Sequence, residues 1–170
     1  WLDGTWTGIK IASIDARRGK TSSTEDDLKN LAKEIHTLPE DFTPHKRIKK
    51  IYNDREQSII EGKNIDWATA EALAFATLLK DGYGVRLSGQ DVGRGTFSHR
   101  HAVLYDQENE KRFVPLRHFR KDQALFEIVD SFLSEFGVLG FEYGYSQADP
   151  KTLVIWEAQF GDFSNGAQTI

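Results

Sequence analysis

The sequence predicts an α/β fold: an open, mostly parallel sheet with helices on both of its faces, preceded by an irregular N-terminal arm and two helices. Short apolar segments of strand length alternate with longer helical segments, which is typical of parallel sheets. The segment 152–156 is apolar almost throughout, as expected for a strand that helices cover on both sides.

Residues 1–23 have no sustained periodicity and predict an irregular, partly anchored arm. After Thr24, acidic residues precede an apolar stripe at helical spacing, which predicts a helix that ends before Pro39. A second amphipathic helix follows Pro44 and stops near Gly62, and we interpret its basic cluster as a solvated face.

Asp66 is the predicted cap of a third helix over 67–79, which is rich in alanine and ends before Gly82. This helix is apolar on nearly all sides, so we expect it to be central and buried. The remaining predicted elements are strands at 85–88, 102–105, 113–116, 125–129 and 152–156, and a helix over 134–147.

Composition excludes several classes of protein. The chain has 170 residues, with 22 basic and 26 acidic side chains and a net charge of −4, which disfavours a nucleic-acid partner. No apolar run approaches the roughly 20 residues that cross a bilayer. With no cysteine, the chain has no disulfide, thiolate metal site or cysteine nucleophile.

The ends of the chain suggest a piece of a longer protein. It starts at Trp1 and stops at Ile170, inside what reads as the opening of a new helix. We expect residues 1–63 to form an arm and helical segment, and 64–170 to form an α/β domain that is truncated at its C-terminal end.

One carboxylate lies at the start of segment 133–144, which is apolar and has glycines at 137, 140 and 144. Ser134 is the predicted helix cap, and Glu135 falls in the first turn. Glu135 could simply complement the helix dipole, as first-turn acids often do. Alternatively it is a functional group, an interpretation that two further polar loops at predicted strand ends favour, because ligands of open α/β sheets bind there.

The first of these loops, 89–101, invites two interpretations that its spacing opposes. Its glycines do not make a nucleotide-binding fingerprint. His99 and His101 have no evident third ligand for zinc, and their spacing would place them on opposite sides of an extended chain. With Arg94 and Arg100 they are better interpreted as hydrogen-bond donors that order the loop, or as groups that face an anionic substrate.

The second loop, 157–166, places two phenylalanines around Asp162. Phe160 and Phe163 could close the core. Alternatively, one ring could be a platform for a flat heteroaromatic cofactor.

Taken together, these motifs resemble the thiamine-diphosphate-dependent dehydrogenase component of 2-oxoglutarate dehydrogenase complexes, and within it the transketolase-like pyrimidine-binding domain. The resemblance covers most of residues 64–170 and is looser over the first 60. The matching segments are 66–75, 87–91, 94–97, 133–135, 140–145 and 156–163.

The resemblance implies a role for each candidate residue. Glu135 matches the catalytic glutamate that binds N1′ of the aminopyrimidine. Leu133 matches the apolar wedge that keeps the cofactor bent, and Phe163 the ring stacked on the pyrimidine. The other residues expected near cofactor or substrate are Phe160, Gln90, His99 and His101, of which the two histidines are also candidates for loop ordering alone.

The resemblance further implies oxidative decarboxylation of 2-oxoglutarate, with transfer of the succinyl group to lipoamide. The second subunit of a homodimer would contribute the diphosphate-binding domain and the Mg²⁺ ligands, because the Gly-Asp-Gly motif is absent here and this chain has no metal ligands of its own. The chain alone should therefore be inactive. Dihydrolipoyl succinyltransferase and dihydrolipoyl dehydrogenase would be partners, in the bacterial cytosol or the mitochondrial matrix. The alternatives are a 2-oxoadipate dehydrogenase of the same family and a non-catalytic assembly module.

Overall fold

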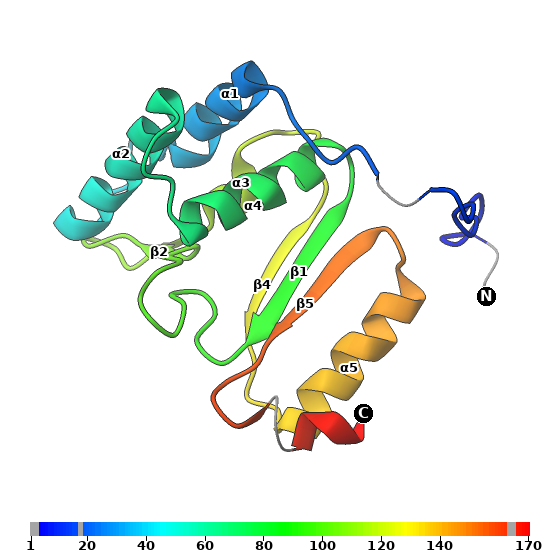
Figure 1. The fold of residues 1–170 in the computed structure, drawn as a ribbon. Coiled ribbons are helices and arrows are strands. Elements are labelled where there is room, and N and C mark those ends of the chain that lie inside the picture. The colour runs from blue at the N-terminus through cyan, green and yellow to red at the C-terminus, as the bar shows by residue number, and fades with distance from the viewer. Residues whose placement is uncertain (1–3, 17–18, 163–165) are drawn as a thin grey trace.

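A computed structural model describes residues 4–16, 19–162 and 166–170. Its centre is a parallel sheet of three strands in the order β4-β1-β5 (Figure 1). The strands are β1 (Gly84–Gly89), β4 (Phe126–Asp130) and β5 (Thr152–Glu157). Helices lie on both faces of this sheet, which confirms the predicted fold class (Figure 1).

On one face, α3 (Trp67–Lys80) packs on β1, and α1 (Glu25–His36) packs on α3. The helix α2 (Lys46–Glu61) packs in turn on α1, and α5 (Glu135–Ala148) covers the opposite face of the sheet. The smaller elements are the antiparallel pair β2 (Leu104–Tyr105) and β3 (Arg112–Phe113), the short helix α4 (Pro115–His118) and the 3-10 helix η2 (Gly166–Thr169).

The predicted helix starts are confirmed by their caps. The Thr24 hydroxyl accepts from the Asp27 amide at 3.3 Å, and the Asp66 carboxylate accepts from the Thr69 amide at 2.7 Å. Each bond satisfies one of the amides that a helix N-terminus leaves without an internal partner.

The prediction of a strand over 113–116 is wrong. β3 ends at Phe113, and Pro115 begins α4, because proline has no amide to donate to a sheet while its fixed φ suits a first helical turn. The strand predicted over 102–105 forms only at Leu104 and Tyr105.

The main core joins the N-terminal helices to the sheet. Leu31 and Ile35 of α1 and Ile59 of α2 belong to the same buried cluster as Phe75 of α3 and Leu87 of β1. Burial of these side chains gives the N-terminal helices and the sheet one common hydrophobic interior.

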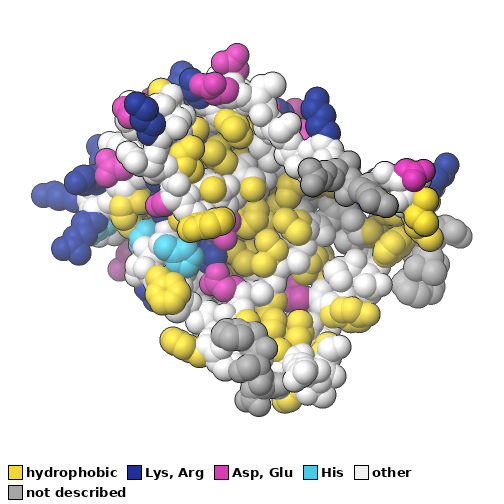
Figure 2. Space-filling view, viewed as in Figure 1, with side chains coloured by type: hydrophobic (Ala, Val, Ile, Leu, Met, Phe, Trp, Pro, Cys, Tyr) yellow, Lys and Arg dark blue, Asp and Glu magenta, His cyan; other side chains and the backbone are white. Residues whose placement is uncertain are grey.

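Not all of the apolar surface is covered. Trp67, at the start of α3, is 92% exposed, and Ala70 and Ala74 are also exposed, so the expectation of a buried helix holds for one side of α3 only. Figure 2 shows hydrophobic side chains gathered on the viewed face over the strands, where β5 forms one edge of the sheet and Leu153 is exposed.

The polarity of α5 is inverted with respect to an ordinary surface helix. Its buried positions toward the sheet include Glu142, whereas Phe136, Phe141 and Tyr143 are at least half exposed. Glu142 binds Arg86 of β1 through two hydrogen bonds, of 2.7 and 2.9 Å. An ion pair therefore lies beside the apolar Val138 in the contact between α5 and the sheet.

The N-terminal arm is anchored through Thr5 and Trp6 at the C-terminal end of α5, which confirms the prediction of a partly anchored arm. The Trp6 indole donates to the Gln147 carbonyl at 2.9 Å, and the Thr5 hydroxyl donates to the Ala148 carbonyl at 3.1 Å. Among the described residues, no helix has both the length and the apolar character that a membrane span requires.

Candidate functional site

The three sheet strands end at the same edge and release three loops there. Gly89 of β1 lies opposite Asp130 of β4 and Glu157 of β5. A Cβ atom on Gly89 would stand 2.7 Å from the Glu157 carbonyl oxygen, so glycine allows the loops after β1 and β5 to approach closely. The convergence expected from parallel topology is therefore present.

A first hollow, which we call the Glu135 hollow, lies at this edge. It brings together three candidate residues from two segments: Gln90 follows β1, whereas Leu133 and Glu135 lie two positions apart at the start of α5. The other residues that line it are Gly89, Ser131, Val138, Trp156, Glu157 and Asp162. The roles assigned to the three candidates stay predictions, but their proximity is a property of the fold.

Glu135 does more than complement the dipole of α5. Ser134 caps the helix by accepting from the Gly137 amide at 3.3 Å. The Glu135 carboxylate instead reaches η2, where its Oε1 accepts from the Ala167 amide. A Cβ on Gly166 would stand 3.0 Å from this carboxylate, so the backbone of the following segment lies directly against it.

A second hollow, of about 360 Å³, lies on the other side of Glu157 and contains His99 and Phe160. Phe97 and Phe160 at its rim are 83% and 81% exposed. The Thr96 hydroxyl donates to the Gln159 side chain at 2.9 Å and links the loops that form it. Phe160 therefore lies in a different hollow from Glu135, and Phe163, the expected stacking ring, falls outside the described residues.

His101 lies in a third hollow, beside Asp91, Arg94 and Asp130. Burial lowers the pKa of His101, and the nearby charge of Arg55 lowers it further. The two histidines thus point into different spaces. The chain between them is not extended, because His101 has a φ of +50°.

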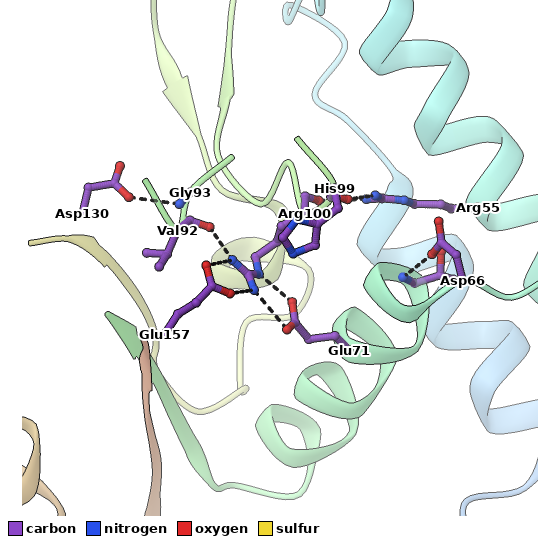
Figure 3. Close-up of polar contacts among 10 residues, drawn as sticks. Arg55, Asp66, Glu71, Val92, Gly93, His99, Arg100, Asp130 and Glu157 are labelled. Atoms are coloured by element: carbon purple, nitrogen blue, oxygen red, sulfur yellow. Dashed lines mark hydrogen bonds and ion pairs between the residues drawn. The ribbon is translucent and has the colours of Figure 1, made fainter. Parts of the chain in front are cut away.

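Arg100 lies at the centre of the loops, and Figure 3 shows it between two carboxylates. It donates to Glu71 of α3 from Nε at 2.6 Å, to Glu157 from both terminal nitrogens, and to the Val92 carbonyl at 2.9 Å. Burial opposes its charge, but the hydrogen bonds with Glu157 and Glu71 outweigh burial and raise the pKa of Arg100. The interpretation of Arg100 as a loop-ordering donor is confirmed.

Sequence reasoning missed the partners of this arginine. Glu71 is an acid on the inward side of an alanine-rich helix, and Glu157 ends an apolar strand. The available signal was an isolated carboxylate in each of two apolar segments, because a buried charge requires a partner. Within the described ranges, no group of three or more His, Cys, Asp or Glu side chains could hold a metal ion.

Residues 63–170 match the model of the transketolase pyrimidine-binding domain. The chain belongs to this family. Along its whole length it is also 52% identical, over 172 aligned positions, to proteins named "2-oxoglutarate dehydrogenase E1 component" from Brucella canis, Brucella suis and Brucella abortus. The chain spans 17% of the length of these relatives.

The candidate site lies at the edge of the sheet where the strands of the matched range end. All three hollows are lined mainly by residues of the matched range. The helices α1 and α2 precede that range, although they share its core. The division of the chain at residue 63 stays a prediction.

Proposed function

We propose that this chain supplies the pyrimidine-binding half of the active site of a thiamine-diphosphate-dependent 2-oxoglutarate dehydrogenase, which decarboxylates 2-oxoglutarate oxidatively and transfers the succinyl group to lipoamide. The observation that carries the proposal is the Glu135 hollow. There a carboxylate and an apolar side chain from the segment after β4 meet an amide from the loop after β1, at the carboxyl edge of the sheet. The names of the relatives support the reaction.

The side chains that line this small hollow, of about 10 Å³, are chemically suited to one end of the cofactor only. A pyrimidine ring needs an apolar wall and a partner for its ring nitrogen, which Leu133 and Glu135 can offer. A diphosphate needs cations, whereas the charged side chains that line the hollow are the carboxylates Glu135, Glu157 and Asp162. The diphosphate and its Mg²⁺ therefore require ligands from another domain.

The chain's own contribution to catalysis is orientation and one proton. Glu135 would hold the proton shared with N1′ of the aminopyrimidine, because the start of α5 fixes its position and the Ala167 amide holds one of its oxygens. Leu133 would exclude water beside it, and Gln90 would face the reacting carbon. When bound, thiamine diphosphate supplies the nucleophilic carbon and the electron sink for decarboxylation.

The outer face of α5 supports a second subunit as the source of the missing ligands. Its exposed aromatic residues alternate with glycines, which let another surface approach closely. We propose that this face lies in a homodimer and that the partner's diphosphate-binding domain completes the site. Dihydrolipoyl succinyltransferase and dihydrolipoyl dehydrogenase would then act on the product in the assembled complex.

The test is Glu135→Gln in the full-length protein that carries this chain. The amide keeps the size of the side chain but cannot accept the proton, so turnover of 2-oxoglutarate should fall by about 10²–10⁴-fold, the usual range for acid–base participation. Hydrogen–deuterium exchange at C2 of the bound cofactor should slow in parallel, while thermal stability should change little. Glu108→Gln, at an exposed position in the turn between β2 and β3, is the matched control.

Wild-type exchange at C2 in Glu135→Gln would remove this residue from the mechanism. The same assay with 2-oxoadipate as substrate tests the alternative specificity. A higher kcat/KM for 2-oxoadipate would assign the chain to the related enzyme, and absence of cofactor binding in the full-length protein would leave the assembly-module interpretation.

A further inference from the structure

Two side chains of α2 bind three consecutive backbone carbonyls of the loop after β1. Arg55 donates to the His99 carbonyl and, at 2.9 Å, to the Arg100 carbonyl, as Figure 3 shows for His99. The Tyr52 hydroxyl donates to the His101 carbonyl at 2.7 Å. Both donors are buried, so these bonds are shielded from water.

The backbone of this segment, residues 98–102, has an unusual conformation. Ser98 and His101 have φ values of +52° and +50°, in the left-handed region that residues other than glycine seldom adopt. The amides of Arg100 and His101 both donate to the Arg94 carbonyl, each at 3.0 Å. Such a conformation persists only where surrounding contacts enforce it.

The contacts with α2 thereby decide where the two imidazoles point. With the three carbonyls turned toward α2, His99 enters the second hollow and His101 the third. Burial raises the pKa of Tyr52, which keeps its hydroxyl protonated as a donor. Its ring also stands edge-on to His36 of α1, at 5.3 Å between ring centres, so the donor itself is held in place.

We propose that Tyr52 and Arg55 are positioning residues that fix the directions of His99 and His101, and that His99, whose hollow shares Glu157 with the Glu135 hollow, faces the 2-oxoacid. The inference rests on the proposed function for the identity of the substrate. It does not follow from the family match, because both residues precede the matched range 63–170. The helix α2, outside that range, thus sets the geometry of a loop inside it.

The test uses Tyr52→Phe and Arg55→Lys in the full-length protein. Phenylalanine removes one hydroxyl and keeps the ring, and lysine keeps the charge but cannot bind two carbonyls in the geometry of a guanidinium. Tyr83→Phe, half exposed directly before β1, and Arg47→Lys, exposed on α2, are the matched controls.

The first readout is amide hydrogen exchange, which needs no activity. The amides of residues 100–102 donate to the Arg94 and Gly93 carbonyls and report the opening of the segment. Loss of one hydrogen bond should speed their exchange by about three- to tenfold, with no change in the controls.

The second readout is kinetic. The KM for 2-oxoglutarate should rise by about tenfold, as expected for misplaced hydrogen-bonding groups, while hydrogen–deuterium exchange at the cofactor C2 stays at the wild-type rate. A higher KM with unchanged exchange at C2 distinguishes an effect on the histidine loop from an effect on Glu135. A general loss of stability would instead affect both exchange reactions and the distant amides of β4.

Unchanged exchange at residues 100–102 in both variants would overturn the proposal, and so would faster exchange with wild-type KM and kcat. If the wild-type protein turns over neither 2-oxoacid, the proposed function fails and the substrate part of this inference fails with it. The amide data would still decide whether α2 holds the segment.

Discussion

Replacement of Arg86 by methionine should test how strongly burial controls the contact between α5 and the sheet. The side chains of Arg86 and Glu142 are 11% and 4% exposed, and Arg86 also lies 3.4 Å from Glu127. In Arg86→Met the Glu142 carboxylate stays buried without its two charge-assisted hydrogen bonds. Breaking such a pair costs about 3–5 kcal/mol, mainly because one charge is left uncompensated in a medium of low dielectric.

A second bidentate ion pair, at a more solvent-exposed position, provides a control. Arg120 binds Glu34 through two hydrogen bonds of 2.6 and 2.8 Å, with side chains that are 30% and 31% exposed. Arg120→Met should therefore cost only about 0.2–1 kcal/mol, because water solvates the glutamate that remains. The comparison holds the bidentate geometry constant and changes the burial.

Urea unfolding monitored by circular dichroism is a suitable assay. With an m-value of about 2 kcal/mol/M, Arg86→Met should lower the midpoint by about 1.5–2.5 M. Adding Glu142→Leu should recover most of the loss, since an apolar pair needs no compensation. Equal losses for Arg86→Met and Arg120→Met, or no recovery in the double variant, would refute the reasoning.

Three further predictions concern the core and the loops. Phe75→Ala should cost about 3–5 kcal/mol in urea melts, as for a large core aromatic, and a loss below about 1 kcal/mol would contradict its placement. Burial lowers the pKa of His36 to about 4, so between pH 6.5 and about pH 4 the unfolded chain binds a proton that the folded protein does not. The free energy of unfolding should therefore decline as the pH falls through this range, and it should decline less steeply in His36→Gln. Equal slopes in the two proteins would exclude the effect. Gly95→Ala would place a Cβ 2.5 Å from the His99 ring and should cost about 1–3 kcal/mol more than Gly62→Ala, a position that also has a positive φ but has open space around it; equal losses in thermal melts would argue against the contact.

The regular elements could be predicted because their signals are local. The Thr24, Asp66 and Ser134 caps, and the apolar strand over 152–156, depend on spacing within a few residues. The strand prediction at 113–116 failed because tertiary context assigned Pro115 to a helix start, which its missing amide permits equally well.

The site was predictable only in part, because its residues meet through topology. The parallel pairing of β1 with β4 explains why Gln90 meets Leu133 and Glu135, which follow β4 two positions apart. The contacts of Arg55 and Tyr52 with the loop after β1 join residues more than 40 positions apart and have no periodic signature. A buried arginine in an otherwise ordinary amphipathic helix is visible only once its burial is known.

The ion pair beneath α5 also fixes the rotation of this helix about its own axis. An apolar contact tolerates sliding and rolling, whereas two parallel hydrogen bonds between Arg86 and Glu142 permit one orientation. Glu135 lies seven positions before Glu142, two helical turns along the same face. Through this rigid helix, Arg86 of β1 therefore sets the direction in which the Glu135 side chain projects from α5 at the edge of the sheet.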